Sequence, residues 1–153
     1  MALPPTIGGF ISFIQNVMGI KPQYLPPGAP VIQAAFDVAM AVVNPSFALV
    51  PVGTAGDSIY SLAVYNLAGD NLINFAPDQE GFTYFQDLRT SFGCNSFRAG
   101  VVQTGGDEGT QAAIIPPEWA QMLTMADLQY IKTPYGRQYM SFAQRFGTLW
   151  GSS

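Results

Sequence analysis

Charged residues are scarce in this sequence. Of its 153 residues, 6 are Lys or Arg and 10 are Asp or Glu, so that 10% are charged, against about 25% in an average soluble domain. Hydrophobic residues make up 48% of the chain. A domain of this size leaves much of its surface in contact with solvent, and polar and charged side chains must keep that surface soluble. The deficit indicates that part of the surface faces another protein or a lipid.

Histidine is absent, and cysteine occurs once, as Cys94. Without histidine, the chain has no Ser-His-Asp or Cys-His catalytic group and no histidine-containing zinc site. A single cysteine excludes an internal disulfide framework and a cysteine-rich metal site. The net charge of −4 disfavours a protein that neutralises DNA phosphates, which needs a basic face. We therefore predict no catalytic residues, no cofactor and no metal ion.

Two uncharged runs, residues 1–20 and 38–56, have lengths that suit a targeting or membrane segment. The first has no early Lys or Arg, and prolines such as Pro5 interrupt it, unlike a secretory signal. The second is broken by Pro45 and Pro51, whereas a spanning helix needs internally satisfied backbone groups. We expect neither run to enter a membrane.

Hydrophobic spacing between Pro and Gly residues predicts a mainly α-helical fold. We expect a compact bundle of about five to six short helices with one extended arm or β-hairpin. The predicted helices cover residues 7–18, 30–43, 59–75, 80–92, a segment that opens at Pro116, 125–131 and 134–146. The predicted N-caps are Thr6, Thr124, Thr133 and either Asp57 or Ser58, because short polar side chains accept hydrogen bonds from the first helical turn.

The helix expected at residues 30–43 is unusually apolar. It contains one charged residue, Asp37. A helix with so little charge is typically surrounded by other apolar elements. We therefore expect it to be buried nearly all round.

Residues 97–115 differ in character from the helical segments. Two short β-prone runs flank the glycine-rich residues 105–109, a pattern typical of two strands joined by a flexible tip. The tip acids, Asp107 and Glu108, lack the alternating oxygen ligands of a calcium loop. We expect one domain over residues 1–153, made of an apolar N-terminal helix with a Pro-rich connection (1–30), a helical core (31–96), this extended arm (97–115), and C-terminal helices with a docking tail (116–153).

Carboxylates leave an enzymatic alternative open. A glycosidase needs only two carboxyl groups, so a small carboxylate-dependent hydrolase is one alternative. Any pair among Asp57, Asp70, Asp78, Glu80 and Asp87 could supply them, and Asp70, Asp78 and Glu80 are the residues to test. No spacing in the chain predicts a perturbed pKa, however. Asp78 and Glu80 are more simply interpreted as solvated turn acids. Asp70 lies one helical turn from both Asn66 and Asn74, and this spacing predicts that the three side chains form a buried or interfacial hydrogen-bonding cluster.

The C-terminal segment combines bases and aromatic residues and contains no acid after residue 130. A final helix can pack its aromatic side chains inward and point Arg to water, and such a helix can also dock on a partner through aromatic and Arg anchors. The candidate interface residues in this segment are Tyr135, Arg137, Tyr139, Arg145, Phe146, Leu149 and Trp150. Those on the arm are Val101, Val102, Asp107, Glu108 and Ile114.

Three stretches of the chain carry a family resemblance: VIQAAFDVAMAVVNPSF at residues 31–47, SIYSLAVYNLAGDNLINF at 58–75 and TPYGRQYMSFAQRFG at 133–147. Taken together and in this order, they resemble the head-tail connector (adaptor) proteins of tailed bacteriophages. The most specific part is residues 133–137. The sequence departs from the family pattern in its Pro-rich first 30 residues and in the aromatic helix within residues 81–92, which leaves the tail type open.

The resemblance implies a virion protein that is assembled in the host cytoplasm and located at the head-tail junction. It implies a homo-oligomeric ring, a dodecamer, beneath the portal protein, with the C-terminal part toward the portal and the next neck or tail protein on the opposite side. DNA would pass through the bore without specific binding, and an acidic balance suits this role because like charges repel phosphates.

Three other functions remain open at this stage. The first is another phage neck, tail-completion or capsid-decorating protein, which composition does not separate from an adaptor. The second is the carboxylate-dependent hydrolase. The third is a peripheral membrane protein that uses residues 1–20 as an interfacial helix, although that helix lacks a basic polar face. The adaptor hypothesis predicts a protein that is not an enzyme and has no membrane partner.

Overall fold

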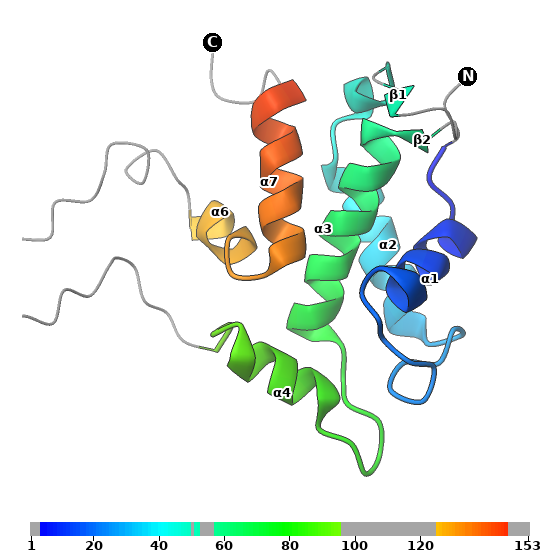
Figure 1. The fold of residues 1–153 in the computed structure, drawn as a ribbon, viewed down its shortest axis with the longest axis vertical. Helices are drawn as coiled ribbons and strands as arrows, with labels where there is room; N and C mark the ends of the chain where they lie inside the picture. The colour runs from blue at the N-terminus through cyan, green and yellow to red at the C-terminus, as the bar shows by residue number, and fades with distance from the viewer. Residues whose placement is uncertain (1–3, 50, 53–56, 96–124, 147–153) are drawn as a thin grey trace, which may run out of the picture.

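The computed structural model describes residues 4–49, 51–52, 57–95 and 125–146 (Figure 1). The helices in these residues are α1 (Ile7–Asn16), α2 (Pro30–Val42), α3 (Ile59–Phe75), α4 (Tyr84–Ser91), α6 (Met125–Tyr130) and α7 (Pro134–Phe146). The expectation of a mainly helical bundle is confirmed. The arm expected at residues 97–115 and the helix expected to open at Pro116 lie outside the described residues.

A 3-10 helix and a minimal β pair connect α2 to α3. The 3-10 helix covers Pro45–Leu49, and strands β1 (Pro51–Val52) and β2 (Asp57–Ser58) pair antiparallel. Pro51 lies opposite Ser58 in this register. The pair therefore places the end of β2 directly at the start of α3.

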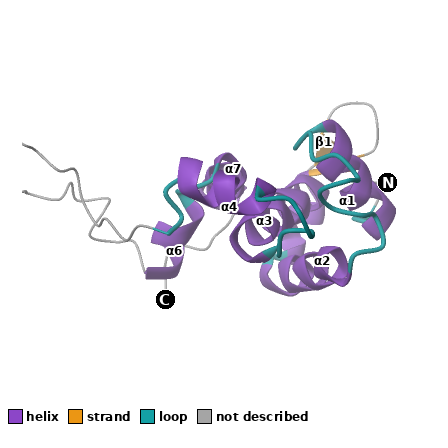
Figure 2. Ribbon diagram, turned by 90° about the horizontal axis from the view of Figure 1, so that it is seen from below, coloured by secondary structure: helices purple, strands orange, loops and turns teal. Residues whose placement is uncertain are grey.

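α3 is the central helix of the bundle. It contacts α1, α2, α4, α7 and the 3-10 helix. Eleven of its 17 residues are buried, including the polar Ser61, Asn66 and Asp70. The helix is thus enclosed on nearly all sides. Figure 2 shows α2 and α7 on opposite sides of it, so these two helices form the flanks of the bundle.

Side-chain caps fix where the helices begin. Thr6 Oγ1 accepts a hydrogen bond from Gly9 N at 3.0 Å, and Thr133 Oγ1 accepts one from Gly136 N at 2.9 Å. Ser58 Oγ accepts one from Ser61 N at 3.1 Å. Such caps stabilise a helix by about 1 kcal/mol each. The N-caps predicted at Thr6 and Thr133 are confirmed, and Ser58 rather than Asp57 caps α3, whereas the cap predicted at Thr124 lies outside the described residues.

Aromatic rings fill the core between α1, α2 and α3. Phe10 has no exposed surface, and its ring stacks on Phe36 and on Tyr65 with centroids 5.9 Å and 6.1 Å apart. The same core continues along α3 to Tyr139 and Met140 of α7. One continuous core therefore joins both flanks to α3.

The expectation that α2 is buried nearly all round is wrong. Only Ile32, Ala35, Phe36 and Ala39 of this helix are buried. Its opposite side is exposed, and Val38 and Val42 keep 53% and 51% of their surface exposed. The low charge of α2 correctly indicated an apolar helix, but its position at the edge of the bundle gives it core neighbours on one side only.

The helix expected at residues 80–92 is shorter than predicted. α4 begins at Tyr84, because Gly81 adopts a positive φ of 82° and residues 79–82 form a turn in which Phe82 N donates to the Gln79 carbonyl at 3.0 Å. Phe85 of α4 is fully buried, whereas Phe82 in the preceding turn stays 42% exposed. The aromatic stripe predicted for this segment is therefore only partly internal.

Candidate functional site

A buried polar contact joins α3 to the first turn of α7. Asp70 of α3 has no exposed surface. The Thr133 hydroxyl donates a hydrogen bond to Asp70 Oδ1 at 2.5 Å and accepts one from Gly136 N at 2.9 Å. We call these three residues the Asp70 junction. It fixes the start of α7 on the middle of α3.

Gly136 makes this approach sterically possible. A Cβ atom at this position would lie 2.0 Å from the Tyr130 carbonyl oxygen and 2.8 Å from Asp70 Oδ1. No side chain fits there without a backbone shift. The Thr-Pro-Tyr-Gly sequence of residues 133–136 therefore has a structural role, with a cap, a helix-starting proline and a glycine that admits the carboxylate.

Burial changes the titration of Asp70. Desolvation raises its pKa from 3.8 to about 6, and the hydrogen bond from the Thr133 hydroxyl opposes this rise. Within the described residues, the buried Asp70 Oδ2 and Asn71 Nδ2 have no hydrogen-bond partner. The junction thus holds a carboxyl group that is easier to protonate than an exposed one.

The predicted Asp70 cluster is confirmed in its burial and differs in its partners. Asn66 donates to the Leu62 carbonyl at 2.8 Å, and Asn74 donates to the Asp70 carbonyl oxygen at 2.9 Å. The carboxylate itself bonds Thr133, which lies 63 residues away in the sequence. The spacing of residues along one helix predicts which side chains of that helix are neighbours. It cannot predict a hydrogen bond to a residue as distant in the sequence as Thr133.

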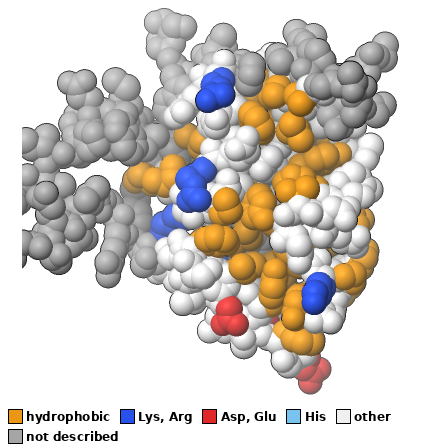
Figure 3. All heavy atoms as spheres, viewed as in Figure 1, with side chains coloured by type: hydrophobic (Ala, Val, Ile, Leu, Met, Phe, Trp, Pro, Cys, Tyr) orange, Lys and Arg blue, Asp and Glu red, His pale blue; other side chains and the backbone are white. Residues whose placement is uncertain are grey.

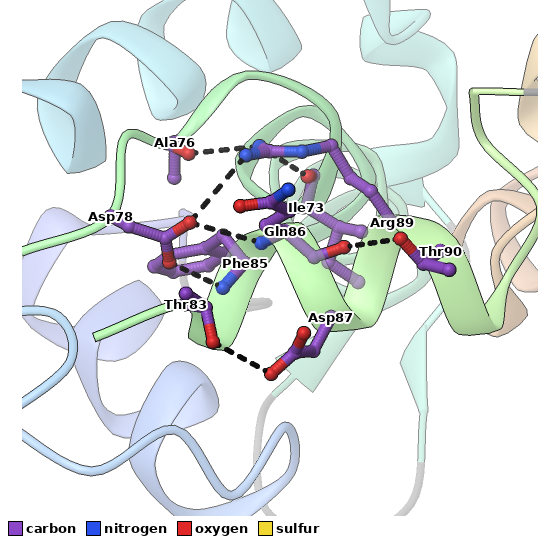
Figure 4. Close-up of polar contacts among 9 residues, drawn as sticks. All are labelled: Ile73, Ala76, Asp78, Thr83, Phe85, Gln86, Asp87, Arg89 and Thr90. Carbon is purple, nitrogen blue, oxygen red and sulfur yellow. Dashed lines mark hydrogen bonds and ion pairs between the residues drawn. The ribbon is translucent and has the colours of Figure 1, made fainter.

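A second polar cluster fastens α4 to the end of α3 (Figure 4). Asp78 accepts hydrogen bonds from Phe85 N at 2.6 Å and Gln86 N at 3.1 Å, so it caps the start of α4. Arg89 donates to the Ile73 and Ala76 carbonyls at 3.2 Å and 2.9 Å, and it lies 3.9 Å from Asp78. The two side chains therefore hold both helices together.

The carboxylates of the hydrolase alternative occupy different places. Asp70 lies in its junction, and Asp78 caps α4 with 19% of its side chain exposed, which corrects the interpretation of Asp78 as a solvated turn acid. Glu80 is exposed, as expected. The described residues contain no group of three or more His, Cys, Asp or Glu side chains placed to hold a metal ion.

Lys132 and Arg89 have roles that sequence reasoning missed. Lys132 donates to the carbonyls of Gly93 and Cys94 at 3.1 Å and 3.4 Å, just beyond the end of α4.

Cys94 is half-buried, and burial is the main cause that raises the pKa of its thiol. This side chain is therefore a partly packed thiol rather than a reactive thiolate.

The candidate interface residues of α7 separate into inner and outer positions. Tyr139 is 7% exposed and its ring meets Tyr130 edge-on, so it belongs to the core and does not face a partner. Tyr135 is half-buried, with its ring edge-on to Phe13 at 6.1 Å. Arg137 and Arg145 are exposed. Only the backbone of Phe146 is described, and Leu149, Trp150, Val101, Val102, Asp107, Glu108 and Ile114 lie outside the described residues.

The chain matches no family model, no curated protein and no solved structure. Among the helices of the described segments, none has the length and hydropathy that crossing a membrane requires. Functional inference therefore depends on the chemistry of the described residues.

Surface charge is unevenly placed on the face shown in Figure 3. Lys and Arg side chains lie over α6 and α7 and also at the lower right of the view, whereas the Asp and Glu side chains lie at the lower end alone, toward α4 and the turn before it. Hydrophobic side chains occupy a broad area between them.

Proposed function

We propose that this protein is a non-enzymatic structural protein of a virion, a head-tail adaptor of a tailed phage. It forms a homo-oligomeric ring, a dodecamer, beneath the portal protein and contributes to the DNA channel. The observation that supports this most is the exposed apolar side of α2, where Val38 and Val42 are about half uncovered. Exposed apolar surface on a charge-poor domain is typical of a surface that a partner covers.

The surface of the folded protein carries fewer charges than the sequence alone suggests, because some charged side chains are buried or half-buried. Of the charged side chains that the structure describes, four are buried or half-buried: Asp70, Asp78, Arg89 and Lys132. They bond backbone groups or other side chains within the fold. The exposed charged side chains among the described residues are Lys21, Asp37, Glu80, Asp87, Arg137 and Arg145. So few charges suit a subunit whose flanks are covered by copies of itself.

The resemblance to connector proteins supplies the location. Residues 133–137, its most specific stretch, form the cap and first turn that anchor α7 on α3. The overall negative charge of −4 suits a ring through which DNA passes without being bound. Portal and neck proteins are then the partners above and below the ring.

Native mass spectrometry of the full-length protein, alone and with the portal protein of the same virus, tests this proposal. We expect a closed homo-oligomer of one size that binds the portal. A protein that stays monomeric at all concentrations and never binds the portal would overturn it. Electron microscopy of the intact particle separates an adaptor from another neck, tail-completion or capsid-decorating protein, because only an adaptor lies directly beneath the portal.

A further inference from the structure

α2 and α7 present matching helices on the two flanks of α3. Each has 13 residues and begins with proline. The buried residues of α2 are Ile32, Ala35, Phe36 and Ala39, and those of α7 are Gly136, Tyr139, Met140 and Ala143. These are the third, sixth, seventh and tenth residues of each helix. Both helices therefore turn the same four positions toward the core.

The outward positions differ in chemistry between the two helices. The α2 outer face consists of Gln33, Ala34, Asp37, Val38, Ala41 and Val42, all exposed. The α7 outer face consists of Pro134, Arg137, Gln138, Ser141, Gln144 and Arg145, of which only Ser141 is half-buried. The first face is mainly apolar, with one acid, Asp37, and one amide, Gln33, which donates a hydrogen bond to Asp37 at 2.7 Å. The second face is mainly polar, with two bases and no acid. The two faces are complementary in charge.

We propose that the α2 outer face of one copy packs against the α7 outer face of the next copy. The occupant of each face is thus a second copy of this chain, and Asp37 of one copy lies between Arg137 and Arg145 of its neighbour. The inference rests on the proposed ring and names the contact that builds it.

The direction of the helices supports this pairing. α2 and α7 both run opposite to α3, and therefore parallel to each other (Figure 1). Asp37 is the eighth residue of α2, and Arg137 and Arg145 are the fourth and twelfth residues of α7. In an in-register parallel contact, the carboxylate is about 6 Å along the axis from each arginine position, which long Arg side chains span. Their aliphatic stems can cover Val38 and Val42.

Charge also disfavours the alternative in which each face meets its own copy. An antiparallel α2–α2 contact places two Asp37 carboxylates within about one helical turn of each other. An antiparallel α7–α7 contact places Arg137 of one copy beside Arg145 of the other. Both pairings oppose like charges, whereas the α2–α7 pairing opposes unlike ones. A contact between two different faces is heterologous, and it closes into a ring when the rotation between copies allows.

Charge exchange on the full-length protein tests the contact, with assembly measured by mass photometry over a concentration series. We expect Asp37→Arg and Arg145→Glu each to raise the concentration for half-assembly at least tenfold, and the combined variant to recover part of the loss, because the new arginine then pairs with Glu at position 145 and still meets Arg137. Glu80→Lys and Lys21→Glu are matched controls, because they make the same charge changes at exposed positions away from both faces. Circular dichroism of each variant establishes that it folds.

The outcomes separate this inference from the proposed function. Unchanged assembly in Asp37→Arg and Arg145→Glu, or no recovery in the combined variant, overturns the α2–α7 contact. If the wild-type protein then still forms a ring and binds the portal, the proposed function stands with a different contact. A wild-type protein that neither assembles nor binds the portal overturns both.

Discussion

Thr133 and Asp70 are 63 residues apart in the sequence and share a hydrogen bond of 2.5 Å in the interior of the fold. The same hydroxyl group accepts the hydrogen bond that caps α7. One side chain therefore sets both the start of α7 and its position on α3. Loss of this hydroxyl removes both functions at once.

Replacing Thr133 with Val keeps its shape and removes its hydroxyl. The Asp70 carboxylate and the Gly136 N–H then lose a partner inside the protein, and an unsatisfied buried group costs about 1–3 kcal/mol. We expect the free energy of unfolding, measured in urea by circular dichroism, to fall by at least that amount. Thr133→Ser is the control, because it keeps the hydroxyl. Equal stability of the Val and Ser variants would contradict the role of the junction.

The raised pKa of Asp70 predicts a pH dependence of stability. Its pKa is about 6 in the folded protein against 3.8 as the ordinary value, so the folded state binds the proton more tightly than the unfolded chain. Its contribution to stability is therefore complete below pH 3.8 and is lost as the pH rises through about 6. At 1.36 kcal/mol per pKa unit, the loss amounts to about 3 kcal/mol.

Comparison with Asp70→Asn isolates this effect from the other titrating groups. The Asn side chain still accepts the Thr133 hydrogen bond and does not titrate. We expect the stability of the wild-type protein relative to Asp70→Asn to fall between pH 4.5 and pH 7.5, measured by thermal unfolding. A constant difference between the two proteins over this range would show that Asp70 keeps an ordinary pKa.

Alanine substitutions at Gly136 and Gly8 are expected to act in opposite directions. A Cβ at Gly136 would lie 2.0 Å from a backbone oxygen, whereas one at Gly8 would have nothing within 4 Å. Gly8→Ala in α1 should stabilise the protein by about 0.5–1 kcal/mol, because alanine loses less backbone entropy on folding. Gly136→Ala should destabilise it by several degrees in Tm. A neutral effect at Gly136 would mean that α7 shifts freely on α3.

The cap supplied by Asp78 predicts a loss of stability at the start of α4. Asp78→Ala leaves the Phe85 and Gln86 N–H groups without their acceptor and removes the partner of Arg89. The expected cost is about 0.5–2 kcal/mol, the usual range for a lost cap. Glu80→Ala, two residues away at an exposed position, should change stability by less than about 0.5 kcal/mol. Chemical denaturation of both variants measures the difference.

Local chemistry made most of the helices predictable. Thr6, Ser58 and Thr133 mark helix starts because a capping side chain acts within three residues of sequence. The predicted start of α4 was less accurate. The hydrophobic spacing continues through Gly81, but the positive φ of this residue is incompatible with a helix, so α4 begins only at Tyr84. Contacts between distant segments gave no local signal, so the partner of Asp70 and the cap from Asp78 emerged only from the fold.

A surface buried inside one chain and a surface buried between chains are both rich in apolar residues, so the sequence does not distinguish them. The apolar composition of α2 led to the expectation of a fully enclosed helix, yet Val38 and Val42 are exposed. Conversely, Tyr139 was a candidate interface residue, because it lies in a segment rich in aromatic residues and bases, yet it is buried in the core. Periodicity reports which residues are apolar, and only the packing shows which of them already have neighbours.

The matching buried positions of α2 and α7 bear on how many copies a ring contains. In the proposed assembly, α2, α3 and α7 repeat in order around the wall, and each copy meets the next through two helix surfaces of equal length. A small rolling motion of one helix on the other would change the curvature of the wall without altering the core of any subunit. The number of copies would then be set by the angle between α2 and α7 at each contact between subunits. A larger side chain in this contact, as in Ala41→Leu, would change that angle and therefore the diameter of the bore.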